Sequence, residues 1–496
     1  MSTNLLKRNK KPLFGGTNKP GMDLRPAQRL NIPVGCGFDL LNAEILKGNK
    51  GEWIINGGLA QTTSVSGPGN VFKSTLTQYL SLAAMNVIMS TSDSFKHTLD
   101  TENNISLNGL SRFLERFDYL PDDMLLGSDP RWTVTNKATV LAGEWIDRYR
   151  KDCLDKLADK NMQIDFTAFN DYRTNTILKL PVPTFYDIDS LSELEGESSI
   201  DLVEDKGIDN SNEVFMKQGA IKTKVLQIVS NIALKTNTYM TMTAQVGKTI
   251  DMATGADKYA PPPRSNTYIN QNTKVKGVSE KFFFLPLTAL IVKKSSVLMN
   301  QTTKMPEYPV NSETEVSTDL HVLDVIPYRN KSGASGGLIQ VVVSQRDGVL
   351  AGLTDFHNCK EHGRFGLDGS NISYNLVICP EVKLSRTTVR SKLDNDPLLR
   401  RAAQITHDLL QSKYLKYVIE NDLWCDPATL YKDLIDLGYD WNLLLQTRNW
   451  YAPDNYDKEL PPYLSIIDLL YARKGKIPYW YDKSKIKKTE EAKASW

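Results

Sequence analysis

The stretch Thr62-Thr63-Ser64-Val65-Ser66-Gly67-Pro68-Gly69-Asn70-Val71-Phe72-Lys73-Ser74 joins two different patterns. Its first five residues are β-branched or small and predict a buried strand, whereas residues 75–87 repeat apolar side chains with helical spacing. The glycine-rich turn between them would point backbone N–H groups at an anion in front of the helix N-terminus. We therefore expect a phosphate-binding loop formed by Gly67, Pro68, Gly69, Asn70, Val71, Phe72, Lys73, Ser74 and Thr75.

Two side chains of this loop have predicted roles in binding ATP. Lys73 would reach the β- and γ-phosphate oxygens, and Ser74 would hold Mg²⁺. Phe72 stands where such loops usually carry glycine, so its ring must point away from a nucleotide that is bound through main-chain atoms. An ordinary glycine turn without a ligand is the alternative that the pattern leaves open.

Strand and helix patterns alternate along the chain on both sides of this loop. Strands are predicted at 95–100, 182–188, 239–244, 281–293, 321–328 and 338–344. A long helical pattern covers 213–235. Such alternation is typical of crossover units around a parallel sheet. The predicted fold class is α/β, with a central, mostly parallel twisted sheet.

The composition divides the chain into three parts. Residues 1–30 are rich in Lys, Asn, Pro and Gly without periodicity and predict a flexible basic arm. Residues 31–352 hold the alternating pattern, and residues 353–496 are aromatic-rich, with helices predicted at 398–417 and 428–437. We expect the last part to be a smaller, α-rich C-terminal domain with a basic tail. The lysines at both ends of the chain are either solvated or auxiliary phosphate contacts.

Bulk properties limit the class of protein. The 496 residues carry a net charge of +2, which argues against a protein that coats DNA by charge alone. No apolar run approaches the roughly 20 residues that span a bilayer, and the N-terminus lacks the apolar block of a secretory signal. The five cysteines form no C-x-x-C pair, which favours reduced thiols. We expect a cytoplasmic protein without membrane attachment.

Two acidic segments follow predicted strands. ATP hydrolysis needs an acid near Mg²⁺ and a base that orients the attacking water. Thr184-Phe185-Tyr186-Asp187-Ile188-Asp189-Ser190-Leu191 ends an apolar strand with acid and hydroxyl residues, as a Walker B strand does. Thr98-Leu99-Asp100-Thr101-Glu102-Asn103 ends an earlier strand. Surface acids that only cap the strand ends are the alternative.

The Phe72-Lys73-Ser74 and Asp189-Ser190 sequences resemble RecA-class DNA recombinases, and within them the phage UvsX branch. The likeness runs from about Asn31 to about Gly348 and follows the order of the family's motifs. It implies a RecA-type P-loop ATPase core, with Asp189 on the Mg²⁺ side and Asp187 as the second candidate. It also implies that Glu102 polarises the attacking water.

The resemblance assigns three further residues. Gln245 ends the strand at 239–244, where the family keeps a Gln or His that contacts the γ-phosphate and opens the second DNA loop. The segment from Val325 to Ser332 is similar to the family's Lys-Asn-Lys segment, which implies that Arg329 and Lys331 reach the γ-phosphate of a neighbouring subunit. A polar strand end and a pair of surface cations are the respective alternatives.

Residues 246–277 form a long, polar, proline-interrupted stretch, which inside a compact core is usually functional or disordered. Cations and tyrosines suited to phosphate neutralisation and base stacking are Lys248, Lys258, Tyr259, Arg264, Tyr268, Lys274 and Lys276. We equate this stretch with the second DNA loop of the family and residues 195–212 with the first. The first is acidic, so any DNA contact there would use backbone amides.

The function implied by the resemblance is an ATP-dependent recombinase that forms a helical filament on single-stranded DNA and pairs it with homologous duplex DNA. Such proteins act with a single-stranded-DNA-binding protein and a loading mediator, in the host cytoplasm or a phage-made replication compartment. Two alternatives remain. A hexameric replicative helicase shares the core and would form closed rings, and a non-hydrolysing DNA-binding scaffold would result if Phe72 spoils the ATP site.

Overall fold

The computed structural model describes residues 28–486 except 104, 129, 137–140, 173, 197–210, 249–272, 311–316, 332, 334, 371, 413–421 and 454–459. Most of the predicted arm and the end of the basic tail therefore lie outside the described residues. Within the described part of the chain, no helix is both long enough and apolar enough to cross a membrane.

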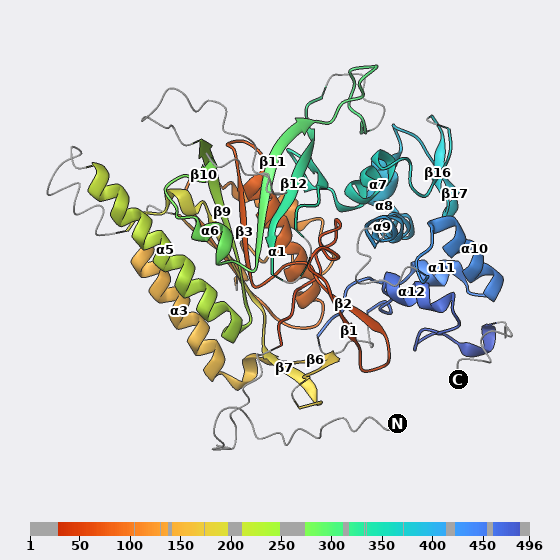
Figure 1. Ribbon diagram of the computed structural model, residues 1–496, viewed down its shortest axis with the longest axis horizontal. Coiled ribbons are helices and arrows are strands. Elements are labelled where there is room, and N and C mark those ends of the chain that lie inside the picture. Colours follow the sequence, from red (N-terminus) through yellow and green to blue (C-terminus); the bar gives the residue numbers. More distant parts are fainter. Residues whose placement is uncertain are drawn as a thin grey trace, which may run out of the picture.

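A large mixed sheet forms the centre of the molecule (Figure 1). Its strands are, in spatial order, β14 (Gly348–Val349), β13 (Ile339–Ser344), β12 (Leu320–Asn330), β11 (Thr288–Val297), β3 (Thr62–Gly67), β9 (Thr238–Lys248), β8 (Thr184–Asp189), β4 (Lys96–Asp100) and β5 (Trp132–Asn136). The six strands from β11 to β5 are parallel, and β12 to β14 are antiparallel. A short strand, β10 (Thr273–Val275), pairs antiparallel with the end of β9. The predicted α/β class with a mostly parallel sheet is confirmed.

Helices cover both faces of this sheet. They are α1 (Lys73–Met89), α2 (Leu107–Leu114), α3 (Ala142–Ala158), α5 (Ser211–Thr236) and α6 (Lys281–Phe284). Figure 1 shows α3 and α5 side by side on one face and α1 on the other. Nearly all of α1 from Leu76 to Ile88 is buried, because the sheet packs on one side of it and further chain on the other. The β3–α1 loop therefore joins a fully buried strand to a mostly buried helix.

The prediction of a strand at 281–293 is wrong for its first residues. Residues 281–284 form the single turn α6, and β11 starts only at Thr288. Phe282 and Phe283 are buried, which makes the segment look like a core strand in sequence. Pro286 has no N–H to donate to a sheet and disfavours helix in the residue before it, so it separates the turn from the strand.

The segment between Asp100 and Thr184 contains elements that the sequence patterns do not predict. Besides α2, β5 and α3 it holds the short helix η1 (Lys160–Met162) and the hairpin β6 (Gln163–Asn170) and β7 (Ile177–Pro181). Strand β5 lies at the edge of the sheet and pairs only with β4 among the described strands. Only Trp132 of its five residues is buried, so the strand gives little apolar signal.

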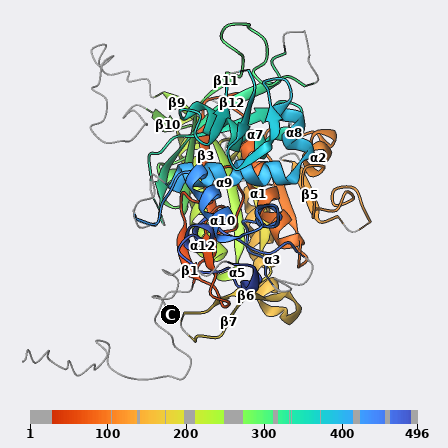
Figure 2. The ribbon, with the colours of Figure 1, turned by 90° about the vertical axis from the view of Figure 1, so that its right-hand side faces the viewer.

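The C-terminal part is rich in short helices, and Figure 2 shows them in front of the sheet. They are α7 (Ala351–Glu361), α8 (Val389–Asn395), α9 (Pro397–Ser412), α10 (Pro427–Leu437), α11 (Trp441–Leu445), α12 (Ile466–Ala472) and η4 (Lys483–Lys485), with strands β15 (Leu367–Gly369), β16 (Tyr374–Leu376) and β17 (Cys379–Leu384). One hydrophobic cluster joins Leu399 and Leu469 of this part to Val342 of β13 and to Ile55. Ile55 belongs to the hairpin of β1 (Glu44–Lys47) and β2 (Trp53–Asn56). The C-terminal helices therefore share a core with the sheet.

Candidate nucleotide site

The β3–α1 loop lies at the carboxyl end of β3, in the middle of the sheet. At Gly67 a Cβ atom would lie 2.6 Å from the carbonyl oxygen of Val292, so glycine is required by the close strand. Phe72, the residue before α1, has a φ of 58°, in the left-handed region that favours glycine. Its ring packs against His321 of β12 with centroids 4.8 Å apart. The ring of Phe72 is therefore held against β12.

Lys73 is held at the mouth of this loop. Its Nζ donates to the carbonyl oxygen of Pro68 at 2.6 Å. Burial lowers the pKa of Lys73, and the carboxylates of Glu102 and Asp189 oppose this effect. The lysine therefore interacts electrostatically with both predicted acids, of which Glu102 follows β4 and Asp189 ends β8.

Asp189 ends β8 beside the start of α1. Its Oδ1 accepts from Thr243 Oγ1 at 2.7 Å, whereas its buried Oδ2 has no hydrogen-bond partner among the described residues. Burial raises the pKa of Asp189, and the nearby hydroxyls of Ser74 and Thr243 oppose this rise. A buried carboxylate oxygen without a donor, next to a serine hydroxyl, fits a hard divalent cation such as Mg²⁺. Ser74 and Asp189 are the residues that could hold it.

Asp187, the second candidate, has other contacts. It forms a salt bridge with Lys96, and both side chains are almost completely buried. Its Oδ2 also accepts from Ser81 Oγ at 3.2 Å and Thr98 Oγ1 at 3.4 Å. The carboxylate of Asp187 is therefore already paired with Lys96 and with hydroxyl donors inside the core. This favours Asp189 over Asp187 as the acid that could hold Mg²⁺.

Hydrogen bonds between the ends of β4 and β8 bring Glu102 close to Asp189. Thr101 donates its N–H to the carbonyl oxygen of Asp189 at 2.7 Å, and its hydroxyl to that of Ser190 at 2.7 Å. The Ser190 N–H donates back to the Thr101 hydroxyl at 2.6 Å. The Asp100 carboxylate fixes the following turn by accepting from the Glu102 N–H at 3.1 Å. Burial and the neighbouring Asp189 raise the pKa of Glu102.

Gln245 lies on the other side of the loop, inside β9. The prediction that it ends this strand is wrong, because β9 continues to Lys248 through its pairing with β10. A Cβ atom at Gly69 would lie 3.1 Å from Gln245 Nε2, so the amide touches the loop. The Gln245 N–H donates to Ser192 Oγ at 3.0 Å, which anchors the backbone. Its side-chain Oε1 accepts from Lys276 Nζ at 3.1 Å. Lys276, which is predicted to lie in a DNA loop, therefore contacts a residue of this site.

Arg329 and Lys331 lie away from the β3–α1 loop. Thr288 pairs with Thr63 at the beginning of β3 and also with Asn330 at the end of β12. The end of β12 therefore lies level with the amino end of β3, whereas the loop follows the carboxyl end of β3. Arg329 donates to the carbonyl oxygen of Phe284, and Lys331 Nζ donates to that of Leu285 at 2.8 Å. These cations are not part of the site of the same chain.

Only some of the remaining residues predicted to contact DNA lie among the described residues. Lys248 and Lys274 are in β9 and β10, whose pairing makes a hairpin stem for the predicted second loop. The side chains of these two lysines are not described. Lys258, Tyr259, Arg264 and Tyr268, and residues 197–210 of the predicted first loop, lie outside the described residues.

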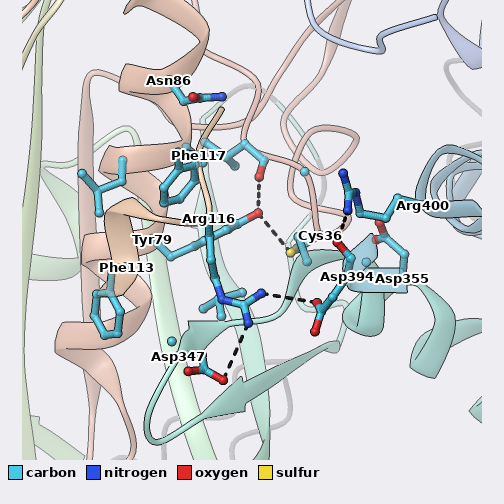
Figure 3. A pocket seen from close by; sticks show the side chains of 18 of the residues that line it. Cys36, Tyr79, Asn86, Phe113, Arg116, Phe117, Asp347, Asp355, Asp394 and Arg400 are labelled. Carbon is cyan, nitrogen blue, oxygen red and sulfur yellow. Dashed lines mark hydrogen bonds and ion pairs between the residues drawn. The ribbon is translucent and has the colours of Figure 1, made fainter. Parts of the chain in front are cut away.

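A cavity of about 690 Å³ adjoins the loop and is not predicted by any sequence motif (Figure 3). It begins at Thr75 and follows α1 past Tyr79 to Asn86. Phe113 and Arg116, from α2 and the turn after it, line another wall. Of the predicted loop residues, only Thr75 lines this cavity.

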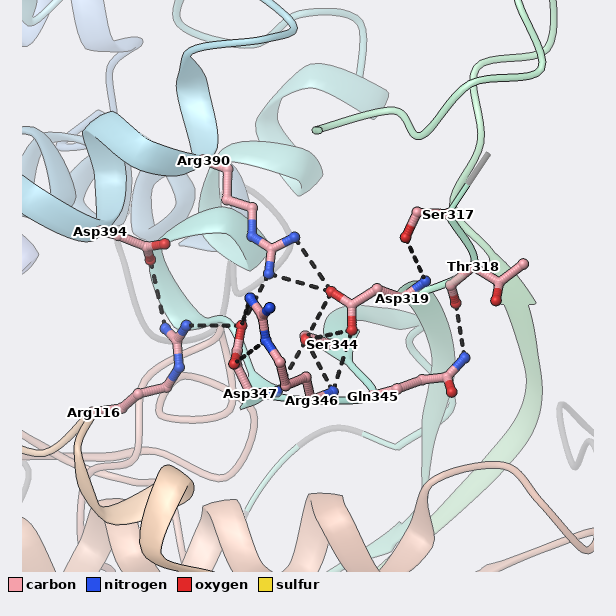
Figure 4. A network of polar contacts seen from close by, with 10 residues as sticks. All are labelled: Arg116, Ser317, Thr318, Asp319, Ser344, Gln345, Arg346, Asp347, Arg390 and Asp394. Carbon is pink, nitrogen blue, oxygen red and sulfur yellow. Dashed lines mark hydrogen bonds and ion pairs between the residues drawn. The ribbon is translucent and has the colours of Figure 1, made fainter. Parts of the chain in front are cut away.

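A polar network borders the cavity and joins distant parts of the chain (Figure 4). Arg116 pairs with Asp347 at 3.7 Å and with Asp394 of α8 at 3.5 Å. Arg390 pairs with Asp347 at 3.1 Å and with Asp319 at 3.3 Å. The network therefore connects the β13–β14 turn to the turn after α2 and to α8. Its members are too far apart in sequence to form a recognisable motif.

No protein-family model matches this chain, and no curated protein matches it in sequence. The fold and the site define its class by themselves. It is an α/β protein with a mixed, mostly parallel sheet, and one edge of that sheet gathers a lysine, two carboxylates and an amide around a glycine-rich loop.

Proposed function

We propose that this chain binds and hydrolyses ATP at the β3–α1 loop and acts as a RecA-class DNA recombinase. The observation that carries the proposal is the meeting of Lys73, Glu102 and Asp189, from three separate elements, at one edge of the sheet. Ligands of open α/β sheets bind at the carboxyl ends of the strands. This arrangement agrees with a RecA-type core, in which the strand before the phosphate loop lies inside a parallel sheet.

The proposed mechanism assigns a role to each of these groups. Backbone N–H groups of the loop and the Lys73 ammonium would bind the β- and γ-phosphates. Ser74 and the unpartnered Oδ2 of Asp189 would hold Mg²⁺, which when bound neutralises charge on the phosphate oxygens. Glu102 would accept a proton from water as the water oxygen attacks the γ-phosphorus and the bond to the β–γ bridging oxygen breaks. The raised pKa of Glu102 makes it a stronger base than an unperturbed glutamate.

The position of Arg329 and Lys331 supports assembly. These cations lie at the amino end of β3, and the loop lies at its carboxyl end. A head-to-tail contact between subunits would therefore bring the cations of one subunit to the loop of the next. Repetition of such a heterologous contact produces a helix or a ring. ATP would then be bound between subunits, and the cations would stabilise the charge of the transition state.

Removal of both cations, Arg329→Ala with Lys331→Ala, is expected to lower DNA-stimulated ATP turnover by about 10²-fold or more, because a cation supplied in trans contributes on the order of 10³–10⁵ to such reactions. ATP binding by the dilute protein should remain. A Lys432→Ala, Lys474→Ala double variant, at two exposed lysines of the C-terminal part, removes the same charge and should retain turnover.

Mixing tests the trans arrangement directly. The cation variant keeps an intact loop, and a Lys73→Ala variant keeps intact cations, so mixed polymers contain some complete interfaces. Turnover should reappear on mixing the two inactive variants. Continued inactivity of the mixture, with both variants folded and polymerising, would contradict the arrangement.

The wild-type test combines ATP turnover, with and without single-stranded DNA, and electron microscopy with a slowly hydrolysed ATP analogue. The proposal expects DNA-stimulated turnover, open helical filaments on single-stranded DNA, and pairing of that strand with homologous duplex. Closed rings with strand displacement would indicate the helicase alternative. DNA binding without ATP binding would indicate the scaffold alternative.

A further inference from the structure

Lys276 has a position that its predicted role in DNA binding does not explain. Strand β10 pairs with the end of β9, with Val275 opposite Val246. One residue further on, the Lys276 N–H donates to the Gln245 carbonyl oxygen at 2.8 Å and continues this ladder. The lysine is thus fixed beside Gln245 by the register of the hairpin.

Two features fix that register. Val275 is buried in the hydrophobic cluster beneath α5, and a slip by one residue would turn it to the other face. Gly277 follows Lys276 with a φ of 62°, and a Cβ atom there would lie 3.2 Å from Lys222 Nζ. The chain therefore turns away directly after Lys276 and leaves its side chain at the nucleotide site.

The side chain of Lys276 contacts the proposed phosphate sensor. Its Nζ donates to Gln245 Oε1 at 3.1 Å, and the amide nitrogen of the same Gln245 faces Gly69 of the loop. Burial lowers the pKa of Lys73, and the ammonium of Lys276 lowers it further, so the two lysines are close enough to interact. A terminal phosphate bound by Lys73 would be within the field of Lys276.

We propose that Lys276 is a second γ-phosphate-contacting residue supplied in cis, which exchanges the Gln245 amide for the terminal phosphate when a nucleoside triphosphate binds. This inference rests on the proposed function of the loop. A hydrogen bond from an ammonium to a phosphate is stronger than one to a neutral amide, so the exchange is favoured by a γ-phosphate. A nucleoside diphosphate lacks that group and leaves the lysine on Gln245. Both strands of the β9–β10 hairpin would then respond to the nucleotide, one through Gln245 and one through Lys276.

The test is equilibrium binding of ADP and of a slowly hydrolysed ATP analogue to the full-length protein. Lys276→Gln should reduce affinity for the analogue about tenfold and leave ADP affinity unchanged. Lys276→Arg should restore most of the preference for the triphosphate, because it keeps a cation at the same place. Lys235 is an exposed lysine at the end of α5. Lys235→Gln removes the same charge away from the loop and should change neither affinity.

The outcomes separate this inference from the proposed function. Equal weakening of both nucleotides, or lower affinity for single-stranded DNA with unchanged nucleotide preference, would overturn the role of Lys276. The same conclusion would follow if Lys276→Gln bound both nucleotides as the wild type does. Failure of the wild-type protein to bind either nucleotide would instead refute the proposed function of the loop.

Discussion

Glu102→Gln is expected to lower ATP turnover by about 10²–10⁴-fold, the usual contribution of a positioned general base. The amide has nearly the shape of the carboxylate but cannot accept a proton from the attacking water. ATP affinity should stay close to the wild-type value, because Lys73 and the loop backbone are unchanged. Single-turnover hydrolysis and equilibrium nucleotide binding measure the two quantities separately.

The dependence of turnover on pH gives a second measurement for Glu102. Burial and Asp189 raise the pKa of Glu102, so the active, deprotonated form is lost at a higher pH than for an unperturbed glutamate as the pH falls. The acidic limb of the turnover profile should therefore lie above the usual glutamate range and disappear from the residual activity of Glu102→Gln. Glu144→Gln, an exposed change on α3, should leave both rate and profile unchanged. Unaltered turnover in Glu102→Gln would remove Glu102 as the base.

The central part of the fold could be predicted because its signals are local. Strand β3, the glycine turn and α1 follow one another within 28 residues, and each has its own pattern. The carboxyl ends of parallel strands share an edge, so acids after β4 and β8 could be expected near the loop. Edge strand β5 and α6 were not predictable in this way. The half-exposed face of β5 gives little apolar signal, and three successive phenylalanines resemble a buried strand.

The candidate site could be predicted only to the level of strand ends. Asp187 and Asp189 are two residues apart and point to the same face of the sheet, so their spacing cannot separate them. Lys96, which pairs with Asp187, is 91 positions away in sequence. Lys276 is assigned to a DNA loop by composition, and only the register with β9 brings it to Gln245. Long-range pairing decides each of these cases.

The buried pair of Lys96 and Asp187 leads to the largest expected change in stability. Lys96→Met should lower the free energy of unfolding by about 3–5 kcal/mol, because removal of one partner leaves an uncompensated buried charge. The side chains of Lys96 and Asp187 are 0% and 2% exposed, so water cannot replace the lost ammonium. Chemical denaturation monitored by tryptophan fluorescence would measure the change, since the ring centroid of Trp132 lies 5.0 Å from Lys96 Nζ.

An exposed pair provides the matched control. Lys432 and Asp436 are four residues apart on α10, with side chains 76% and 64% exposed. Exposed helix pairs of this kind contribute about 0.3–0.5 kcal/mol, so Lys432→Met should have little effect. A loss in Lys96→Met as small as the loss in Lys432→Met would mean that Asp187 is not a buried, charged partner.

A double variant separates the charge of Asp187 from its place in the hydrogen-bond network. Asp187→Asn keeps an oxygen that can accept from Ser81, Thr98 or Thr241 and removes the negative charge. Combined with Lys96→Met, it should recover most of the stability lost in the single variant, because no unpaired charge remains. The double variant should also still bind ATP, since Asp189 and Ser74 are unchanged. Recovered stability with lost nucleotide binding would instead place Asp187 in the metal site and reverse the choice between the two acids.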